Sequence, residues 1–134
     1  MATNAQWVFE KAMTLIDKVN DTTGQPDPGI SAPYRARALG LINVLVSELS
    51  SVSAGFASTG DGARPPVREV TDFEQAIGLD DAVLRGVLPY GLAGLLILEE
   101  NANSAAYLLE KYKEVAAQLA RQLPRSFLPI TDVY

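Results

Sequence analysis

The pattern of apolar and polar residues along the chain is dominated by the run Val87–Leu98, within LDDAVLRGVLPYGLAGLLILEEN at residues 79–101. Between the opening aspartates and the closing glutamates of this segment only Arg85 is charged, so a helix here is apolar almost all round. Helices of that kind lie in the centre of a fold. Pro89 removes one backbone N–H, and its ring collides with the carbonyl four residues earlier, which predicts a kink or break. We therefore expect a buried, kinked central helix.

The residues around this run indicate how the central helix begins and packs. Asp80 and Asp81 open it, where negative charge is favourable beside the unpaired N–H groups of a first helical turn. Gly86, Gly91 and Gly94 each weaken a helix by roughly 1 kcal/mol relative to alanine. Glycine permits close approach of a neighbouring backbone instead. We expect a tight helix contact along this side.

Three further segments carry apolar residues at helical spacing, over about Asn4–Asn20, Pro33–Val52 and Ser104–Leu123. Proline is a good first helical residue, which favours the start at Pro33. Side chains that can accept N–H bonds precede the other two helices: Thr3 or Asn4, and Asn103 or Ser104. The apolar stripes predict these core residues: Val8, Ala12, Leu15, Ile16 and Val19; Tyr34, Ala38, Leu41, Ile42, Leu45 and Leu49; Ala105, Leu108, Leu109, Tyr112, Ala116, Leu119 and Leu123.

The connections between these helices complete the expected architecture. The turn between the central and last helices is short, so they should pack antiparallel as a C-terminal helical hairpin. Residues 53–66 read as a long flexible loop, and Val67–Phe73 alternates enough for a short extended segment or an edge strand. The tail at 124–134 is apolar but broken by proline, so it reads as extended. We predict a single all-α domain over residues 1–134, with about four helices.

Composition excludes several functions. A net charge of −5 argues against a nucleic-acid binder, which needs a basic face, and we expect no sequence-specific nucleic-acid contact. The chain has no cysteine and no histidine, which removes the usual zinc and copper ligands and the usual nucleophile–base pairs. It has no P-loop, GxSxG or HExxH motif. We expect no catalytic, cofactor-binding or metal-binding residues, and no enzymatic activity.

The longest apolar run falls short of the about 20 residues that a membrane-spanning helix needs. The N-terminal residues MATNAQWVFEKAM also lack the basic and apolar regions of a signal peptide. We expect no membrane partner.

Two pairs of charges near helix ends are ambiguous. Arg35 and Arg37 lie near the start of a helix, the unfavourable end for cations, and either carry a small penalty or contact carboxylates elsewhere. Glu99 and Glu100 close the central helix, where solvation or a basic partner patch must offset them. Neighbouring helical residues point about 100° apart, so neither these acids nor the opening aspartates converge on one metal ion without further ligands.

The candidate interface residues are apolar side chains that the helical core does not accommodate. Trp7 points with the polar face of the first helix, and it either folds over a neighbouring loop or faces a partner subunit. The others belong to the tail, which docks on its own core or on another molecule: Phe127, Leu128, Ile130, Val133 and Tyr134.

The segment DFEQAIGLDDAVLRGVLPYGLAGLLILEEN, followed by LLEKYKEV and a tail ending ITDVY, resembles small proteins encoded among the head-morphogenesis genes of tailed phages and Gram-positive prophages. It is most similar to the head–tail connector (adaptor, or head-completion) group. The similarity covers most of the chain and is strongest from Asp72 to Val115. IGLDD and LPYGLA are its more distinctive parts, and the loop at 53–66 has no matching motif.

This resemblance implies a small, mainly helical, non-enzymatic subunit that assembles as a ring at the portal vertex. The implied partners are further copies of the chain and other phage head or tail proteins such as the portal. The implied location is the host cytoplasm during assembly, and the virion if the phage is functional. The alternative from the residues alone is a monomeric or dimeric helical binding or regulatory module, which captures a partner helix in a groove at the Pro89 kink.

Overall fold

A computed structural model of the chain describes residues 3–17, 26, 28–50 and 68–122. The loop at 53–66 and the tail at 124–134 lie outside the described residues. The fold of the described part is all-α, as predicted. It has four helical units, and the central unit is divided in two, which gives the helices α1 (Ala5–Leu15), α2 (Pro28–Leu49), α3 (Asp81–Gly86), α4 (Leu88–Leu96) and α5 (Ala102–Gln122).

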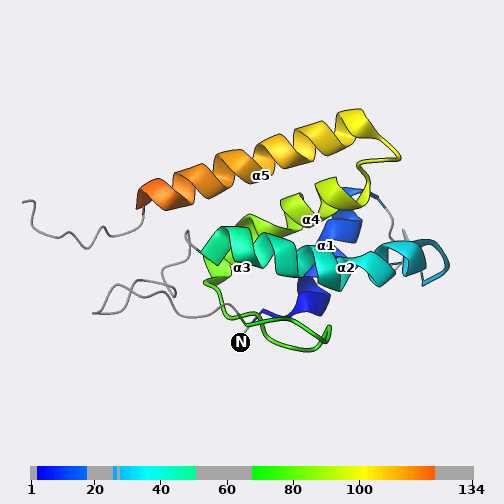
Figure 1. Ribbon diagram of the computed structural model, residues 1–134. Coiled ribbons are helices and arrows are strands. Elements are labelled where there is room, and N and C mark those ends of the chain that lie inside the picture. Colours follow the sequence, from blue (N-terminus) through cyan, green and yellow to red (C-terminus); the bar gives the residue numbers. More distant parts are fainter. Residues whose placement is uncertain (1–2, 18–25, 27, 51–67, 123–134) are drawn as a thin grey trace, which may run out of the picture.

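Helix α4 is the centre of the structure, and every other helix contacts it. It lies between α5 on one side and α1 and α2 on the other (Figure 1). Leu88, Leu92 and Leu96 are fully buried on α4, which confirms that the longest apolar run forms the core. Leu98, at the end of the run, is instead 47% exposed, because α4 ends at Leu96 and the chain turns outward.

The break in the central unit falls at Val87, two residues before Pro89. The N–H of Val87 still donates to the carbonyl of Val83 at 3.1 Å, which ends α3, and α4 begins at the next residue. Pro89 therefore lies in the first turn of α4, where a missing N–H costs nothing. The prediction of a kink or break is confirmed. The break also means that the proline ring does not have to face the carbonyl of Arg85 inside a continuous helix.

Two glycines of α4 receive side chains from α5. A β-carbon at Gly91 would lie 2.7 Å from the ring of Tyr112, and one at Gly94 would lie 2.7 Å from Cγ of Leu109. The partner's number falls as the glycine's number rises, so the two helices are antiparallel, as predicted. The expected close approach is thus confirmed at these glycines, although side chains more than backbone fill the space. The prediction of a close neighbour is wrong for Gly86, where a β-carbon would meet nothing within 4 Å.

The start of α1 is held by the segment that precedes α3. The side chain of Asn4 accepts a hydrogen bond from the N–H of Trp7 at 2.9 Å, so Asn4 is the cap. The N–H of Gln6, which has no partner inside the helix, donates to the carbonyl of Phe73 at 2.8 Å. An isolated bridge joins Asn4 to Ala76. These bonds satisfy the free end of α1 and fix where the preceding segment lies.

The predicted extended segment is attached to α2 by one side chain. Among the described residues 68–73 there is no strand, but Val70 is buried. The amide group of Asn43 donates to the carbonyl of Val70 at 2.9 Å and accepts from its N–H at 2.7 Å. Asn43 thereby takes the place of a neighbouring strand for this one residue.

Three predicted helix boundaries are wrong. Helix α1 ends at Leu15 rather than near Asn20, because Asp17 has a positive φ of 59°, a left-handed conformation that stops a helix. Helix α2 begins at Pro28, and Pro33 lies inside it on the exposed side. Helix α5 begins at Ala102 because Asn101 accepts from the N–H of Ser104 at 3.1 Å, so the cap precedes the predicted one.

The α4–α5 contact predicts opposite effects of one substitution at different glycines. Gly91→Ala and Gly94→Ala should each lower the free energy of unfolding by about 1–3 kcal/mol, because the added methyl group overlaps Tyr112 or Leu109. Gly40→Ala, in the middle of α2 with nothing within 4 Å, should raise it by about 0.4–1 kcal/mol. Urea unfolding of the three variants tests this, and an unchanged midpoint for both α4 variants contradicts the described packing.

Asn43 gives a second stability prediction. Asn43→Ala should lower the free energy of unfolding by about 2–4 kcal/mol, because both polar backbone groups of buried Val70 lose their partner. Asn43→Asp keeps the acceptor but not the donor and should show a smaller loss. The control is Ser47→Ala, which removes an exposed hydroxyl that donates to the carbonyl of Asn43 at 3.0 Å and should change stability by less than about 0.5 kcal/mol. Equal losses for Ser47→Ala and Asn43→Ala would contradict the assignment.

Candidate functional site

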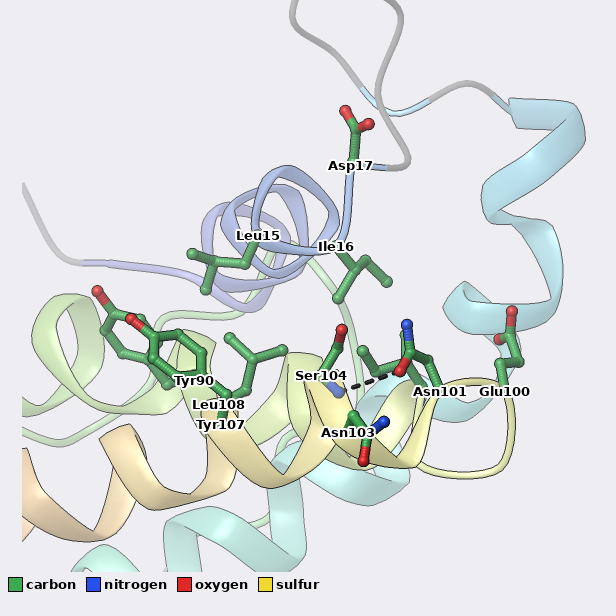
Figure 2. A pocket seen from close by; sticks show the side chains of 11 residues that line it. Leu15, Ile16, Asp17, Tyr90, Glu100, Asn101, Asn103, Ser104, Tyr107 and Leu108 are labelled. Atoms are coloured by element: carbon green, nitrogen blue, oxygen red, sulfur yellow. Dashed lines mark hydrogen bonds between the residues drawn. The ribbon is translucent and has the colours of Figure 1, made fainter.

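An open pocket of about 700 Å³ lies where the end of α1, the turn after α4 and the first turns of α5 meet (Figure 2). Ligand pockets in proteins commonly measure about 300–1,000 Å³, so this one has room for several side chains or a small ligand. The residues that line it are Leu15, Ile16, Asp17, Tyr90, Ile97, Glu100, Asn101, Asn103, Ser104, Tyr107 and Leu108.

Much of the pocket is apolar and open to solvent. Tyr107 is 69% exposed and Leu15 is 38% exposed, so both present apolar surface to solvent. Leu108, beside Tyr107 on α5, is buried and joins the pocket to the core. Figure 2 shows the rings of Tyr90 and Tyr107 on one side of the pocket, opposite Glu100. Exposed apolar side chains around a concave surface are typical of a binding site.

The charged residues of the lining are both acidic. Asp17 comes from the residue just after α1, and Glu100 from the turn between α4 and α5. The lining includes no lysine and no arginine. The pocket therefore combines apolar surface with negative charge, and it favours a ligand that carries both apolar groups and a cation.

Glu100 is held in place by α2. The hydroxyl of Tyr34 donates to Oε1 of Glu100 at 2.6 Å, and the rest of the Tyr34 side chain is buried. Burial and this hydrogen bond raise the pKa of Tyr34 above its ordinary value. Nearby, Arg37 donates to the carbonyl of Leu96 at 3.1 Å, so a cation meets the C-terminal end of α4. The acidic turn is thus fixed against α2 by a tyrosine and an arginine.

The polar residues at the start of α5 have mainly structural contacts. Oδ1 of Asn101 accepts from the N–H of Ser104 at 3.1 Å, which Figure 2 draws as a dashed line. The carbonyl of Asn101 accepts from the N–H of Ala105 at 2.9 Å. Asn101 therefore shapes the pocket by starting α5 there. The apolar side chains, the two carboxylates and the side chains of Asn103 and Ser104 complete the lining.

The chemistry available at the pocket follows from the residue types in its lining. In the described part of the chain, no group of three or more acidic, histidine or cysteine residues is placed to hold a metal ion. The lining contains neither a cysteine nor a histidine, since the chain has none. What the pocket offers chemically is apolar contact and attraction for cations.

The predicted interface residue Trp7 lies away from this pocket. Its ring is partly buried, with the guanidinium of Arg85 4.8 Å and the ammonium of Lys11 5.4 Å from the ring centre. Arg85 also donates to the hydroxyl of Thr3 at 2.9 Å, and this hydroxyl donates to Asp81 at 2.8 Å. Trp7 is therefore covered by cations from two helices within the chain. The five predicted interface residues of the tail lie outside the described residues.

Because α2 begins at Pro28, Arg35 and Arg37 lie in its second and third turns and not at its N-terminal end. The guanidinium of Arg35 lies 3.8 Å from the ring centre of Phe73, and its Nη1 donates to Gln6 at 2.9 Å. Arg37 bonds a backbone carbonyl, as described above. Neither alternative from the sequence, a penalty at the helix start or contacts with carboxylates, describes these contacts: Arg35 stacks on an aromatic ring, and Arg37 binds the end of a helix.

The sequence analysis did not identify the pocket, although one signal was available. Leu15 and Ile16 were predicted as core residues of α1, but the early end of that helix brings both to the pocket. Tyr107 lies off the predicted apolar stripe of α5, as Trp7 lies off that of α1. An aromatic residue on the polar face of an amphipathic helix is the pattern that would have found it.

The Tyr34–Glu100 hydrogen bond predicts how stability depends on pH. Because folding raises the pKa of Tyr34 above 10.0, its contribution is complete below about pH 10 and is lost as the pH rises through the folded-state pKa. Tyr34→Phe should lower stability by about 1–2 kcal/mol at pH 7. Between pH 9 and about pH 11, the stability of the Tyr34→Phe variant should fall by less than that of the wild type.

Urea unfolding at several pH values measures both effects. Tyr112 accounts for part of the remaining alkaline loss, because burial and its bond to Glu48 raise its pKa as well. The double variant Tyr34→Phe/Tyr112→Phe should therefore show the smallest dependence on pH. An alkaline loss identical in the wild type and in Tyr34→Phe would contradict the role given to Tyr34.

No protein-family model, no curated protein and no solved structure matches the chain. In the part of the chain that the structure describes, no helix is both long and apolar enough to cross a membrane. A functional assignment must therefore rest on the residues and on the pocket.

Proposed function

We propose that the protein is a non-enzymatic assembly subunit of a tailed phage or prophage, of the head–tail connector type. The observation that carries the proposal is the open, apolar and acidic pocket at one end of a small helical domain, which suits a protein partner. In this proposal the partners are further copies of the chain and other phage head or tail proteins such as the portal. The protein acts in the host cytoplasm during assembly and stays in the virion where the phage is functional.

The pocket supports a protein partner because of the side chains it exposes. Tyrosine is enriched in protein interfaces, where its ring gives a large contact area and its hydroxyl tolerates water. Tyr90 and Tyr107 both line the pocket, together with the half-exposed Leu15. The acidic rim adds the means to select a partner segment that carries a cation.

The resemblance to connector proteins also supports the proposal. The segments that carry it contain residues that pack the core of the domain. In IGLDD, Ile77 and Leu79 are buried, and Asp81 accepts a hydrogen bond from Thr3. LPYGLA begins α4 and contains Gly91, which receives Tyr112. The more distinctive segments therefore occupy positions on which the packing of the domain depends.

The second candidate, a monomeric or dimeric binding or regulatory module, uses the same pocket. This candidate was expected to bind its partner in a groove at the Pro89 kink. Pro89 is buried and does not line the pocket, so the pocket is not that groove. The observation that favours this candidate is that the pocket of a single chain can hold a partner segment without any assembly of copies. Oligomeric state and portal binding separate the two.

Size-exclusion chromatography with light scattering, followed by pull-down with the portal protein encoded in the same genome, tests the proposal. We expect a mass above the monomer's 14.4 kDa at high concentration, or a complex with the portal, or both. Tyr107→Asp should weaken the association at least about tenfold, as expected for an aromatic anchor in an interface. Val44→Asp, at an exposed apolar site on α2 outside the pocket, should leave the association unchanged. A monomer at every concentration that does not bind the portal contradicts the proposal and favours the binding module.

A further inference from the structure

We propose that the pocket binds residues 125–128 of a second copy of this chain, with Arg125 at the acidic rim and with Phe127 and Leu128 in the apolar part. The inference deepens the proposed function, because it names the contact by which copies assemble. It rests on the chemistry of the pocket and on how far the chain after α5 can reach.

The chemistry of this short stretch, RSFL, complements the pocket. The lining offers apolar surface from residues such as Leu15, Tyr107 and Leu108, and negative charge from Asp17 and Glu100. Arg125 supplies a cation, and Phe127 and Leu128 supply large apolar groups within three residues of it. A guanidinium suits such a site, because it pairs with carboxylates and also stacks on aromatic rings.

Helix geometry prevents the chain's own stretch from occupying the pocket in this orientation. At roughly 1.5 Å per residue, α5 places Gln122 about 21 Å along its axis from Leu108, the nearest lining residue on that helix. Fully extended and turned back along α5, the backbone from Gln122 to Leu128 spans at most about 22 Å, which brings only its end to the near edge of the pocket. Helix α5 carries its C-terminal end away from the turn that follows α4 (Figure 1).

The acidic rim lies still farther from the end of α5. Gln122 is about 30 Å along the axis from Ala102, the helical residue nearest to Glu100. Arg125 follows Gln122 by three residues, which extend about 11 Å at most. The Arg125 that meets Glu100 must therefore belong to another copy. Such a contact joins two different surfaces, head to tail, and repeats from copy to copy until it closes into a ring or continues as a filament.

Two variants that each damage one side of the contact test this directly. Tyr107→Asp damages the pocket and leaves the tail intact, whereas Phe127→Asp damages the tail and leaves the pocket intact. Tyr107 is 69% exposed, so its replacement should spare the fold, and thermal melts of both variants check this. By sedimentation velocity at matched concentrations, each variant alone should associate at least about tenfold more weakly than the wild type.

Mixing the two variants gives the decisive measurement. The intact tail of Tyr107→Asp can enter the intact pocket of Phe127→Asp, so the mixture should form a dimer and nothing larger. Asp17→Asn and Arg125→Gln should each weaken wild-type association by about two- to fivefold, with little further loss in the double variant. Asparagine adopts the left-handed conformation of Asp17 as readily as aspartate does, so the first of these changes mainly charge. Val44→Asp is the matched control and should associate like the wild type.

The inference is overturned if the wild type is monomeric at all concentrations, if neither variant weakens association, or if the mixture behaves like the two variants alone. A portal complex that forms in any of these cases leaves the proposed function standing, with a different contact between subunits. If the wild type does not bind the portal but the mixed variants form a dimer, the contact between pocket and tail is supported and the connector assignment is contradicted.

Discussion

The structure depends on the close contact between α4 and α5, which only glycine permits at two positions of α4. Tyr112 occupies the space over Gly91, and Leu109 occupies the space over Gly94. Side chains that interlock in this way fix both the direction and the register of α5, since sliding by one residue would place a β-carbon against a ring. The start of α5, and with it one wall of the pocket, is positioned by this packing.

Polar side chains decide how the remaining segments attach to this pair of helices. Asn43 binds both backbone groups of Val70. Asn4 caps the start of α1, and Asn101 caps the start of α5. In each case an amide side chain satisfies a backbone group that would otherwise lose its partner on burial. These bonds add specificity to a core whose apolar side chains could pack in more than one arrangement.

The pocket follows from where three helices end or begin. Helix α1 stops at Leu15, α4 turns outward after Leu96, and α5 starts at Ala102, so three helix ends meet without filling the space between them. Tyr34 then holds Glu100 at the rim. In the assembly that we propose, this pocket is the surface that receives a segment of another copy, as repeated head-to-tail contact requires.

The sequence by itself determined the all-α class, the buried central helix with its break, the antiparallel pairing with the last helix and most core positions, because each depends on local periodicity or on proline and glycine chemistry. Only the tertiary structure decided where α1 ends, that Asn101 caps α5, and that Trp7 lies beneath Arg85. Of the pocket, the sequence showed only one sign, Tyr107 on the polar face of α5. The pocket is formed by residues from α1, the turn after α4 and α5, and their proximity depends on long-range packing that no local pattern records.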